Sequence, residues 1–302
     1  MSVHEFILIS DYDGLEISCL ISTPDSKPSA ILQISHGMCG CKERYLPFMQ
    51  YMASRGIACV TNDHRGHGSS IKSSEDLGYM YEGGYEALIQ DMKLVTEHVM
   101  HLYPSLPFYL LGHSMGSLAA ILYAADWSDR LSGLILCGIP YCSPAVSVSS
   151  FLLSSICRFG GGYVRLPLIQ NVSSGFYNRR FRKEGFQAWT CSDPEAREAF
   201  MSDPKCNFSF TANGAMNLLA MLHKASEPGV MSRADKDLDI LILHGTDDPC
   251  TAFGRSVSEF SVNLIKSGLN NVKKIAYQHL RHEILNEIGK ETVWNDIFMF
   301  MQ

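Results

Sequence analysis

The chain has 302 residues, 46% of them hydrophobic, and a formal net charge of −6, so it can bury a large core and lacks the positive charge of a general nucleic-acid surface. Its ten cysteines are scattered and include no Cys-x-x-Cys pair, which is typical of buried, reduced thiols rather than of a disulfide scaffold. Neither a secretory leader nor an uncharged apolar run of ~20 residues is evident, so we expect a cytoplasmic protein with no nucleic-acid partner.

The first third of the chain predicts a sheet built in a βαβ rhythm. Two β-rich runs open it, and the Asp13-Gly14 pair between them favours a tight hairpin. Two continuous apolar runs follow, as expected for parallel strands that are covered on both faces. In chain order we expect strands at 5–10, 15–23, 30–35 and 57–62 and helices at 43–54 and 85–102.

The segment 110–120 is an apolar run that is interrupted by Gly-x-Ser-x-Gly and continues as a small-residue helix. This pattern is typical of a sharp strand-to-helix turn that exposes one serine, and Gly112 and Gly116 leave room for it. Ser114 is therefore the predicted nucleophile, and the N–H of Met115 at the helix start is a predicted oxyanion donor. The alternative is an ordinary glycine-rich turn.

The rest of the chain returns to the same rhythm after one interruption. An apolar strand is expected at 131–139, after which residues 140–233 show serine clusters and apolar helical pieces at 151–159 and 215–223 but no clear strand. We therefore predict an α/β fold with core segments 1–139 and 234–302 and a helical cap at 140–233, inserted after the sixth strand. Beyond the cap we expect strands at 239–244 and 272–279 and helices at 252–266 and 291–300.

A serine nucleophile needs a base and an acid that orients the base, and both candidates follow late strands. Asp247 and Asp248 follow the strand at 239–244, and by position either one is a candidate acid while the other caps the next helix. His282 lies on the loop beyond the last strand and is the predicted base. His279, nearer the strand end, is interpreted as structural.

A second oxyanion donor is expected at the end of the strand at 30–35. There the turn His36-Gly37-Met38 occupies the position from which a sheet with such a serine turn supplies a second backbone N–H, so Met38 is the predicted donor. Gly37 lets the backbone approach the serine. The alternative is again a simple glycine turn.

With these residues placed, the chain resembles the monoacylglycerol lipase and lysophospholipase branch of the α/β-hydrolases, also known as the serine aminopeptidase-like hydrolases. The resemblance implies a mostly parallel eight-stranded sheet flanked by helices, Asp248 rather than Asp247 as the acid, and His282 as the base. It also implies ester hydrolysis without a metal or organic cofactor, and we expect Gly37, Cys39 and His113 to contact the substrate. The resemblance is carried by the segments 36–38 (HGM), 63–69 (DHRGHGS), 112–116 (GHSMG), 245–248 (GTDD) and 281–287 (RHEILNE).

Two further segments, 189–193 and 202–208, look like the family's cap over the acyl pocket, and 63–69 looks like its structural loop, where His64 and His67 are expected to form internal hydrogen bonds rather than a metal pair. Ser117 replaces a glycine that is usual in the family. The turn continues as Met38-Cys39-Gly40-Cys41, where mammalian monoacylglycerol lipases have smaller residues, so we expect a different pocket on the alcohol side.

The cap also suggests the substrate and a partner surface. Its apolar residues suit a fatty acyl chain, with packing onto the core as the alternative: Phe151, Leu152, Leu153, Ile156, Phe159, Met216, Leu218, Leu219 and Met221. Its basic residues suit transient contact with anionic lipid, with a solvated face as the alternative: Arg158, Arg165, Arg179, Arg180, Arg182 and Lys183.

The predicted substrate is therefore a small lipid-like ester. Within enzymes, the same residues would suit a short-chain carboxylesterase, a thioesterase or a proline iminopeptidase. Outside enzymes, the alternative is a scaffold protein that kept the hydrolase fold, which would be expected to lack a member of the triad.

Overall fold

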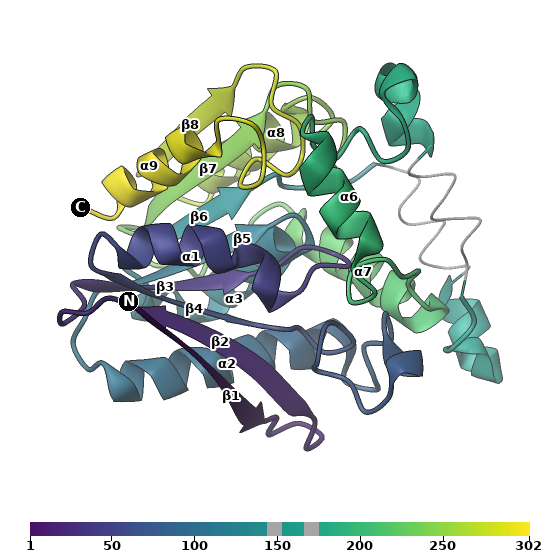
Figure 1. The fold of residues 1–302 in the computed structure, drawn as a ribbon, viewed down its shortest axis with the longest axis horizontal. Helices are drawn as coiled ribbons and strands as arrows, with labels where there is room; N and C mark the ends of the chain where they lie inside the picture. The colour runs from purple at the N-terminus through teal and green to yellow at the C-terminus, as the bar shows by residue number, and fades with distance from the viewer. Residues whose placement is uncertain (144–152, 166–174) are drawn as a thin grey trace.

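The computed structural model describes residues 1–143, 153–165 and 175–302. Its centre is one eight-stranded sheet in the order β1-β2-β4-β3-β5-β6-β7-β8 (Figure 1). The first two strands pair antiparallel and β2 pairs antiparallel with β4, whereas all further neighbours are parallel. The strands are β1 (Ser2–Ile9), β2 (Glu16–Thr23), β3 (Ala30–Ser35), β4 (Ile57–Asn62), β5 (Phe108–His113), β6 (Gly133–Cys137), β7 (Asp239–Gly245) and β8 (Val272–Tyr277).

Helices cover both faces of the sheet, as continuous apolar strands require. In β6, Leu134 and Leu136 pack on one face and Ile135 and Cys137 on the other, so alternate side chains enter two separate cores. The first core also contains residues of α2 (Gly84–Leu102), α3 (Met115–Trp127) and α8 (Arg255–Lys266). The second core contains residues of α1 (Leu46–Ala53) and α9 (Lys290–Phe300).

A helical segment joins β6 to β7, as the sequence predicts. Figure 1 shows α6 and α7 at one end of the sheet, at the right of the view. The elements described there are η4 (Cys157–Gly161), η5 (Asn178–Glu184), α6 (Pro194–Ser202) and α7 (Ala212–Ala225). Residues 151 and 152 of the predicted helix 151–159 lie outside the described residues. The cap boundaries at 140 and 233 remain a prediction.

Several predicted boundaries shift where the backbone turns left-handed. The helix predicted from residue 252 begins at Arg255, because Ala252, Phe253 and Gly254 all have positive φ angles. The strand predicted to reach residue 279 ends at Tyr277. The helix predicted at 43–54 begins as the 3-10 turn η1 (Lys42–Tyr45) and continues as α1. Elsewhere in the chain, two more short 3-10 turns are η2 (Ser74–Asp76) and η3 (Ser128–Arg130).

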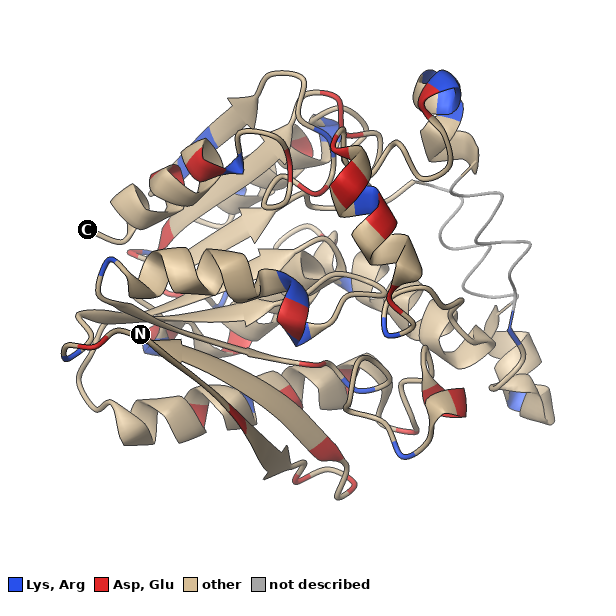
Figure 2. Cartoon of the chain, viewed as in Figure 1, with Lys and Arg blue, Asp and Glu red and all other residues tan. Residues whose placement is uncertain are grey.

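Charged residues are distributed over many elements, and a basic group stands out on η5 in the upper right of Figure 2. In the portion of the chain that the structure describes, no helix is at once long enough and apolar enough to cross a membrane.

Candidate active site

Ser114 stands at the sharp turn between β5 and α3. Its φ of 55° and ψ of −119° lie outside the helical region, and its N–H donates to the carbonyl of Cys137 at 2.9 Å. A Cβ on Gly116 would lie 2.0 Å from the carbonyl oxygen of Ser35, and one on Gly112 would lie 2.3 Å from the carbonyl oxygen of Gly116. Both glycines are therefore required by close backbone packing, and this packing presents the serine.

The structure brings the three predicted chain-distant side chains together. The His282 Nε2 atom lies 2.8 Å from Ser114 Oγ, and its Nδ1 atom lies 2.9 Å from Asp248 Oδ2. Asp248 is completely buried, and its other oxygen accepts the N–H of Cys250 at 2.8 Å. The serine hydroxyl, the imidazole and the carboxylate thus form one continuous hydrogen-bonded line.

The electrostatics suit an imidazole that accepts a proton. Burial by itself would lower the pKa of His282, but the charge of Asp248 and its hydrogen bond outweigh burial and raise this pKa above its usual value of 6.5. Asp247, the alternative acid, instead lies 3.5 Å from Arg180 and 3.8 Å from the exposed ring of His279. Only Asp248 of the two aspartates contacts His282 in the described structure.

The turn at residues 36–40, here called the oxyanion turn, has its peptide groups oriented by a histidine. His36 Nε2 accepts the N–H of His64 at 2.9 Å, so its Nδ1 carries the hydrogen and donates to the carbonyl of Gly37 at 2.8 Å. The same carbonyl accepts the N–H of Gly40 at 3.0 Å. Because the peptide is trans, the N–H of Met38 points the opposite way.

Met115 is the first residue of α3, where N–H groups lack helical partners. Over residues 1–143, 153–165 and 175–302, neither its N–H nor that of Met38 donates to a protein acceptor. Burial lowers the pKa of His36 to about 4, so this ring is neutral at physiological pH and keeps its tautomer.

A pocket of about 210 Å³ opens at Ser114 and His282. It is lined by Gly37 and Cys39, two of the three predicted substrate contacts, and by Met38, a predicted oxyanion donor. Its other lining residues come from the cap and from the loop after His282: Phe186, Gln187, Trp189, Thr190, Phe200, Met201, Cys206, Asn207, Phe208, Ser209 and Glu283. The segments 189–193 and 202–208, which resemble the family's cap, therefore both contribute to it.

Of the apolar residues that the sequence assigned to the acyl chain, Phe151 and Leu152 lie outside the described residues, and the others do not line the pocket. Met221 is buried in the core beside α3, and Met216 does not line the pocket. Leu218 and Leu219 pack against that core, whereas Phe159 is 89% exposed. The alternative of packing onto the core is thus correct for Leu218, Leu219 and Met221, and other aromatic side chains line the pocket at the serine.

His113 requires a correction, because it does not line the pocket. Its ring is buried, its Nε2 donates to the carbonyl of His282 at 3.2 Å, and its Nδ1 accepts the hydroxyl hydrogen of Tyr45 at 3.1 Å. Burial lowers the pKa of His113, so the neutral ring satisfies both bonds in one tautomer. This side chain holds the backbone of His282 instead of meeting a substrate.

Sequence reasoning gave no role to residues that surround the imidazole. The Trp189 ring lies 5.3 Å from the His282 ring, centre to centre. Glu283 pairs with Arg44 at 2.9 Å, and this charge outweighs burial and lowers the Glu283 pKa to about 2. Glu287 is buried and accepts the N–H of Ser192 at 2.9 Å. Both glutamates follow His282 within the motif at 281–287. Their place in this motif is the sequence signal that could have identified them.

Arg165 is also placed differently from the prediction of a basic cap face. Its guanidinium donates to the carbonyl oxygens of Leu77 and Glu75, both at 2.8 Å, and to that of Ser209. It therefore ties the cap to the core. Arg158 and the η5 residues Arg179, Arg182 and Lys183 are exposed.

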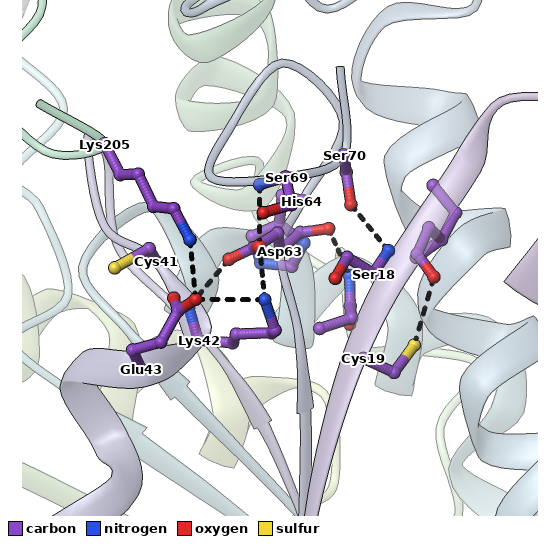
Figure 3. Close-up of polar contacts among 12 residues, drawn as sticks. Ser18, Cys19, Cys41, Lys42, Glu43, Asp63, His64, Ser69, Ser70 and Lys205 are labelled. Atoms are coloured by element: carbon purple, nitrogen blue, oxygen red, sulfur yellow. Dashed lines mark hydrogen bonds and ion pairs between the residues drawn. The ribbon is translucent and has the colours of Figure 1, made fainter. Parts of the chain in front are cut away.

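A chain of ion pairs, buried at its Asp63 end, runs from the loop at 63–69 to the cap residue Lys205 (Figure 3). Asp63 accepts the backbone N–H groups of Lys42 at 2.7 Å and Ser69 at 2.8 Å, and it pairs with Lys42 Nζ at 3.2 Å. Lys42 also pairs with Glu43, which reaches Lys205 of the cap at 2.7 Å. The loop at 63–69 is thus fixed by charge.

Comparisons with known proteins agree with this geometry. The family model described as serine aminopeptidase, S33, matches residues 26–289. A monoacylglycerol lipase of Mycolicibacterium smegmatis is 25% identical over 284 residues, or 94% of this chain and 92% of that protein. A monoglyceride lipase homolog of monkeypox virus is 34% identical over 138 residues, or 43% of this chain and 44% of that protein.

The crystal structure of a thermostable carboxyl esterase from Bacillus coagulans in complex with glycerol matches with a TM-score of 0.91 and 27% identity over 100% of both chains. The predictions of fold and family are therefore confirmed. The chain belongs to the serine aminopeptidase S33 family, in the monoacylglycerol lipase branch of the α/β-hydrolases, and is a serine hydrolase of the ester-cleaving class.

Proposed function

We propose that the protein cleaves esters of fatty acids with small polar alcohols, with monoacylglycerols and lysophospholipids as the substrate class, and that Ser114, His282 and Asp248 act through an acyl-enzyme. The supporting observation is the hydrogen-bonded line of 2.8 and 2.9 Å that ends in the pocket. Such a line lets an otherwise weak hydroxyl nucleophile lose its proton as it attacks.

In the proposed mechanism, His282 Nε2 takes the proton of Ser114 Oγ while the oxygen attacks the ester carbonyl carbon. The carbonyl oxygen becomes negative and is held by the N–H groups of Met38 and Met115, and Asp248 stabilises the imidazolium. His282 then gives its proton to the departing alcohol. Water then gives a proton to the same nitrogen as its oxygen attacks the acyl carbon. The bond between this carbon and Ser114 Oγ breaks, the fatty acid leaves, and His282 returns the proton to Oγ, which restores the serine.

The pocket lining supports a substrate with both apolar and polar parts. Phe186, Phe200 and Phe208 offer aromatic surface, while Gln187 and Asn207 offer amide groups. The Mycolicibacterium relative is named a monoacylglycerol lipase, and the Bacillus esterase was crystallised with glycerol. A short-chain carboxylesterase or a thioesterase would use the same three residues, so the substrate class needs its own test.

Peptidase activity ranks lower, because the pocket offers no uncommitted acid for a substrate amine. Glu283 is the one acidic side chain among the described residues that line it. That carboxylate already pairs with Arg44 and accepts a hydrogen bond from Asn286 at 2.9 Å. A non-catalytic scaffold also ranks lower, since a scaffold would not need all three members of the relay in contact.

The cap surface supports a transient contact with membranes during substrate uptake. Phe159 is 89% exposed and Phe176 is 64% exposed, and both lie near exposed arginines in sequence. Exposed aromatic side chains beside basic ones favour binding at an anionic lipid surface.

The first prediction tests Ser114 directly. A fluorophosphonate should label the wild-type protein on this serine, and Ser114→Ala should abolish labelling and reduce kcat by up to ~10⁶-fold. Ser54→Ala is the control, because Ser54 is an exposed serine at the end of α1; this variant should keep both the labelling and the kcat of the wild type. Labelling of another residue, or near-normal hydrolysis by Ser114→Ala, would contradict the triad.

A hydrolysis panel then tests the substrate class. Monoacylglycerols and lysophospholipids should be cleaved with higher kcat/KM than p-nitrophenyl acetate, thioesters or aminoacyl amides. If only the short ester is cleaved, the lipid proposal fails while the triad remains supported.

A further inference from the structure

Two buried thiols from distant parts of the chain meet beside the pocket. Cys41 follows the oxyanion turn, and Cys206 belongs to the cap loop between α6 and α7. Their Sγ atoms are 3.6 Å apart. The Oδ2 atom of Asp203 lies 3.9 Å from the Cys41 sulfur and 3.8 Å from the Cys206 sulfur. Two sulfurs and one carboxylate oxygen therefore form a compact triangle across the boundary of cap and core.

The dimensions of this triangle match one face of a zinc tetrahedron. With Zn–S distances of about 2.3 Å and tetrahedral angles, two sulfur ligands lie about 3.7 Å apart. A carboxylate oxygen at about 2.0 Å from the ion would lie about 3.5 Å from each sulfur, so Asp203 has to move only slightly. Within the described residues, this is the one group of three or more His, Cys, Asp or Glu side chains whose ligand atoms all lie within 4.8 Å of one another.

We propose that Cys41, Cys206 and Asp203 bind a zinc ion, with water as the fourth ligand, and that the ion fastens the cap loop to the core beside the oxyanion turn. Thiolate ligands favour zinc over magnesium or calcium. Binding displaces the thiol protons, because the thiolate is the ligand. The ion takes no part in the hydrolysis proposed above, so neither proposal depends on the other.

The surroundings of the triangle support this assignment. The backbone N–H of Lys205 donates to Asp203 Oδ1 at 2.8 Å, which leaves Oδ2 facing the sulfurs. The carbonyl of Asp203 accepts the N–H groups of Cys206 and Asn207 at 2.9 and 2.8 Å, so the ligand loop is already folded into a turn. Cys206 also lines the pocket, which provides a path for the ion from solvent.

Local charge also fits the site. Two thiolates, a carboxylate and a zinc ion carry a net charge of −1, and the positively charged Lys205 adjoins Cys206 in the chain. The ion pair between Lys205 and Glu43 crosses the same boundary (Figure 3). Figure 3 shows the Cys41 sulfur pointing away from Asp63, on the side of the cap residue Lys205.

A disulfide is the competing interpretation of two close thiols. It would require the sulfurs to approach to about 2.05 Å, with two electrons and two protons passing to an oxidant. The carboxylate of Asp203, in contact with both sulfurs, has no function in a disulfide but completes a metal site. The structure therefore favours zinc.

The test uses cobalt as a spectroscopic probe for zinc in the full-length chain. After removal of metal with a chelator, Co²⁺ should produce the intense visible bands of tetrahedral cobalt and a near-ultraviolet thiolate band, and zinc should displace it at one ion per chain. Cys41→Ser and Cys206→Ser should lose the thiolate band. Asp203→Asn should weaken binding at least about tenfold.

Cys142→Ser is the matched control, because Cys142 is half-buried and lies outside the triangle; it should keep the full spectrum. The wild-type titration does not depend on whether any variant folds. A wild-type protein that produces no tetrahedral cobalt spectrum would overturn the proposal, as would an unchanged spectrum in Cys206→Ser. A Cys41–Cys206 cross-linked peptide in a non-reducing digest, without zinc binding, would assign the pair to a disulfide instead.

Discussion

Ser114 occupies a backbone conformation that a serine does not choose by itself. Positive φ angles at residues other than glycine store on the order of 1–3 kcal/mol, which the surrounding structure must supply. Close backbone packing offsets this conformational energy at Ser114. Gly116 packs against the carbonyl of Ser35, and Gly112 packs against the carbonyl of Gly116. The reactive geometry is therefore coupled to the stability of the whole turn.

This coupling predicts the outcome of Gly116→Ala. Alanine normally stabilises a helix by about 1 kcal/mol relative to glycine, but here its Cβ would lie 2.0 Å from a backbone oxygen. We expect the free energy of unfolding to fall by about 1–3 kcal/mol, together with loss of kcat. Urea denaturation and steady-state kinetics measure both.

The matched control for this substitution is Gly162→Ala. Its Cβ would be 3.6 Å from Tyr79 and 3.8 Å from Asn213, which are ordinary contacts. If both variants unfold at the same urea concentration, close packing at the turn between β5 and α3 does not hold Ser114 in place.

The second residue-scale prediction concerns pH. His282 accepts a proton only when it is neutral, and Asp248 raises its pKa above 6.5. We expect kcat/KM to fall as the pH drops through an apparent pKa above that value. In Asp248→Asn the raising charge is gone and burial, which lowers the pKa, remains. The rate should fall by about 10⁴-fold, and the residual activity should persist to lower pH than in the wild type.

The measurement is the pH profile of kcat/KM for a neutral ester. An acid limb at the same pH in both proteins would show that Asp248 does not set the pKa of the base. A variant with a shifted limb but nearly full activity would show that the carboxylate is not needed to hold the imidazole.

At the scale of elements, hydrophobic pattern predicted the buried strands well and the pocket poorly. The strands at 30–35 and 57–62 have the predicted ends, since every residue in them is buried and polar residues follow. The pocket is made of loop residues such as Phe186 and Phe208, whose positions depend on how the cap folds onto the core. Periodicity marks a helix face as apolar but does not say which surface it meets, which explains the misassigned α7 residues.

The candidate site shows the same division. Motif order predicted that Ser114, His282 and one of two aspartates would meet, because the carboxyl ends of parallel strands meet at one edge of the sheet. Position alone left Asp247 and Asp248 open, and the family resemblance selected Asp248. Nothing in the sequence predicted that His113 turns away from the pocket toward Tyr45. His113 lies on the same face of β5 as Leu111, and Leu111 packs in the core that also contains Tyr45.

The loop after β4 carries the element-scale prediction. Asp63 and Lys42 are both buried, with side chains 0% and 1% exposed, so Asp63 depends on Lys42 for charge balance and is the buried one of the two acidic partners of Lys42. Asp63→Asn removes the buried partner of the Lys42 ammonium and leaves only Glu43, which is 38% exposed, so the free energy of unfolding should fall by up to about 3–5 kcal/mol. Urea or thermal denaturation measures the change.

The control lies at the other end of the same chain of ions. Lys205 is 40% exposed and its partner Glu43 is 38% exposed, so Lys205→Met should change stability by no more than about 1 kcal/mol. Equal effects of the two substitutions would show that burial does not determine the strength of these pairs.

Across the whole molecule, the cap and the loop that carries His282 are joined by several bonds. Arg281 donates to the carbonyl of Ala188 and pairs with Glu184 at 2.6 Å, and Glu287 accepts from Ser192. The N–H of Glu283 donates to the carbonyl of Thr190 at 2.7 Å. A movement of the cap would therefore reach the imidazole, so contacts made by the cap surface can affect catalysis.

The exposed cap surface provides the last prediction. Vesicles that contain anionic lipid should carry the wild-type protein upward in a flotation gradient, and vesicles of neutral lipid should carry less. Replacing Phe159 and Phe176 by serine removes two exposed apolar side chains, each worth roughly 1.5–3 kcal/mol when fully buried in an apolar phase. The double variant should lose most of its flotation but keep its activity on a soluble ester, because neither residue lines the pocket.

Ile7→Ser is the control for this experiment, since Ile7 is 57% exposed on β1, on a different part of the molecule from the cap (Figure 1). It should float like the wild type. If flotation does not depend on anionic lipid, the basic residues of the cap do not contribute to binding, because they attract lipid through its negative charge. If the double variant also floats normally, the cap is not the lipid-facing surface, and substrate has to reach Ser114 from solution.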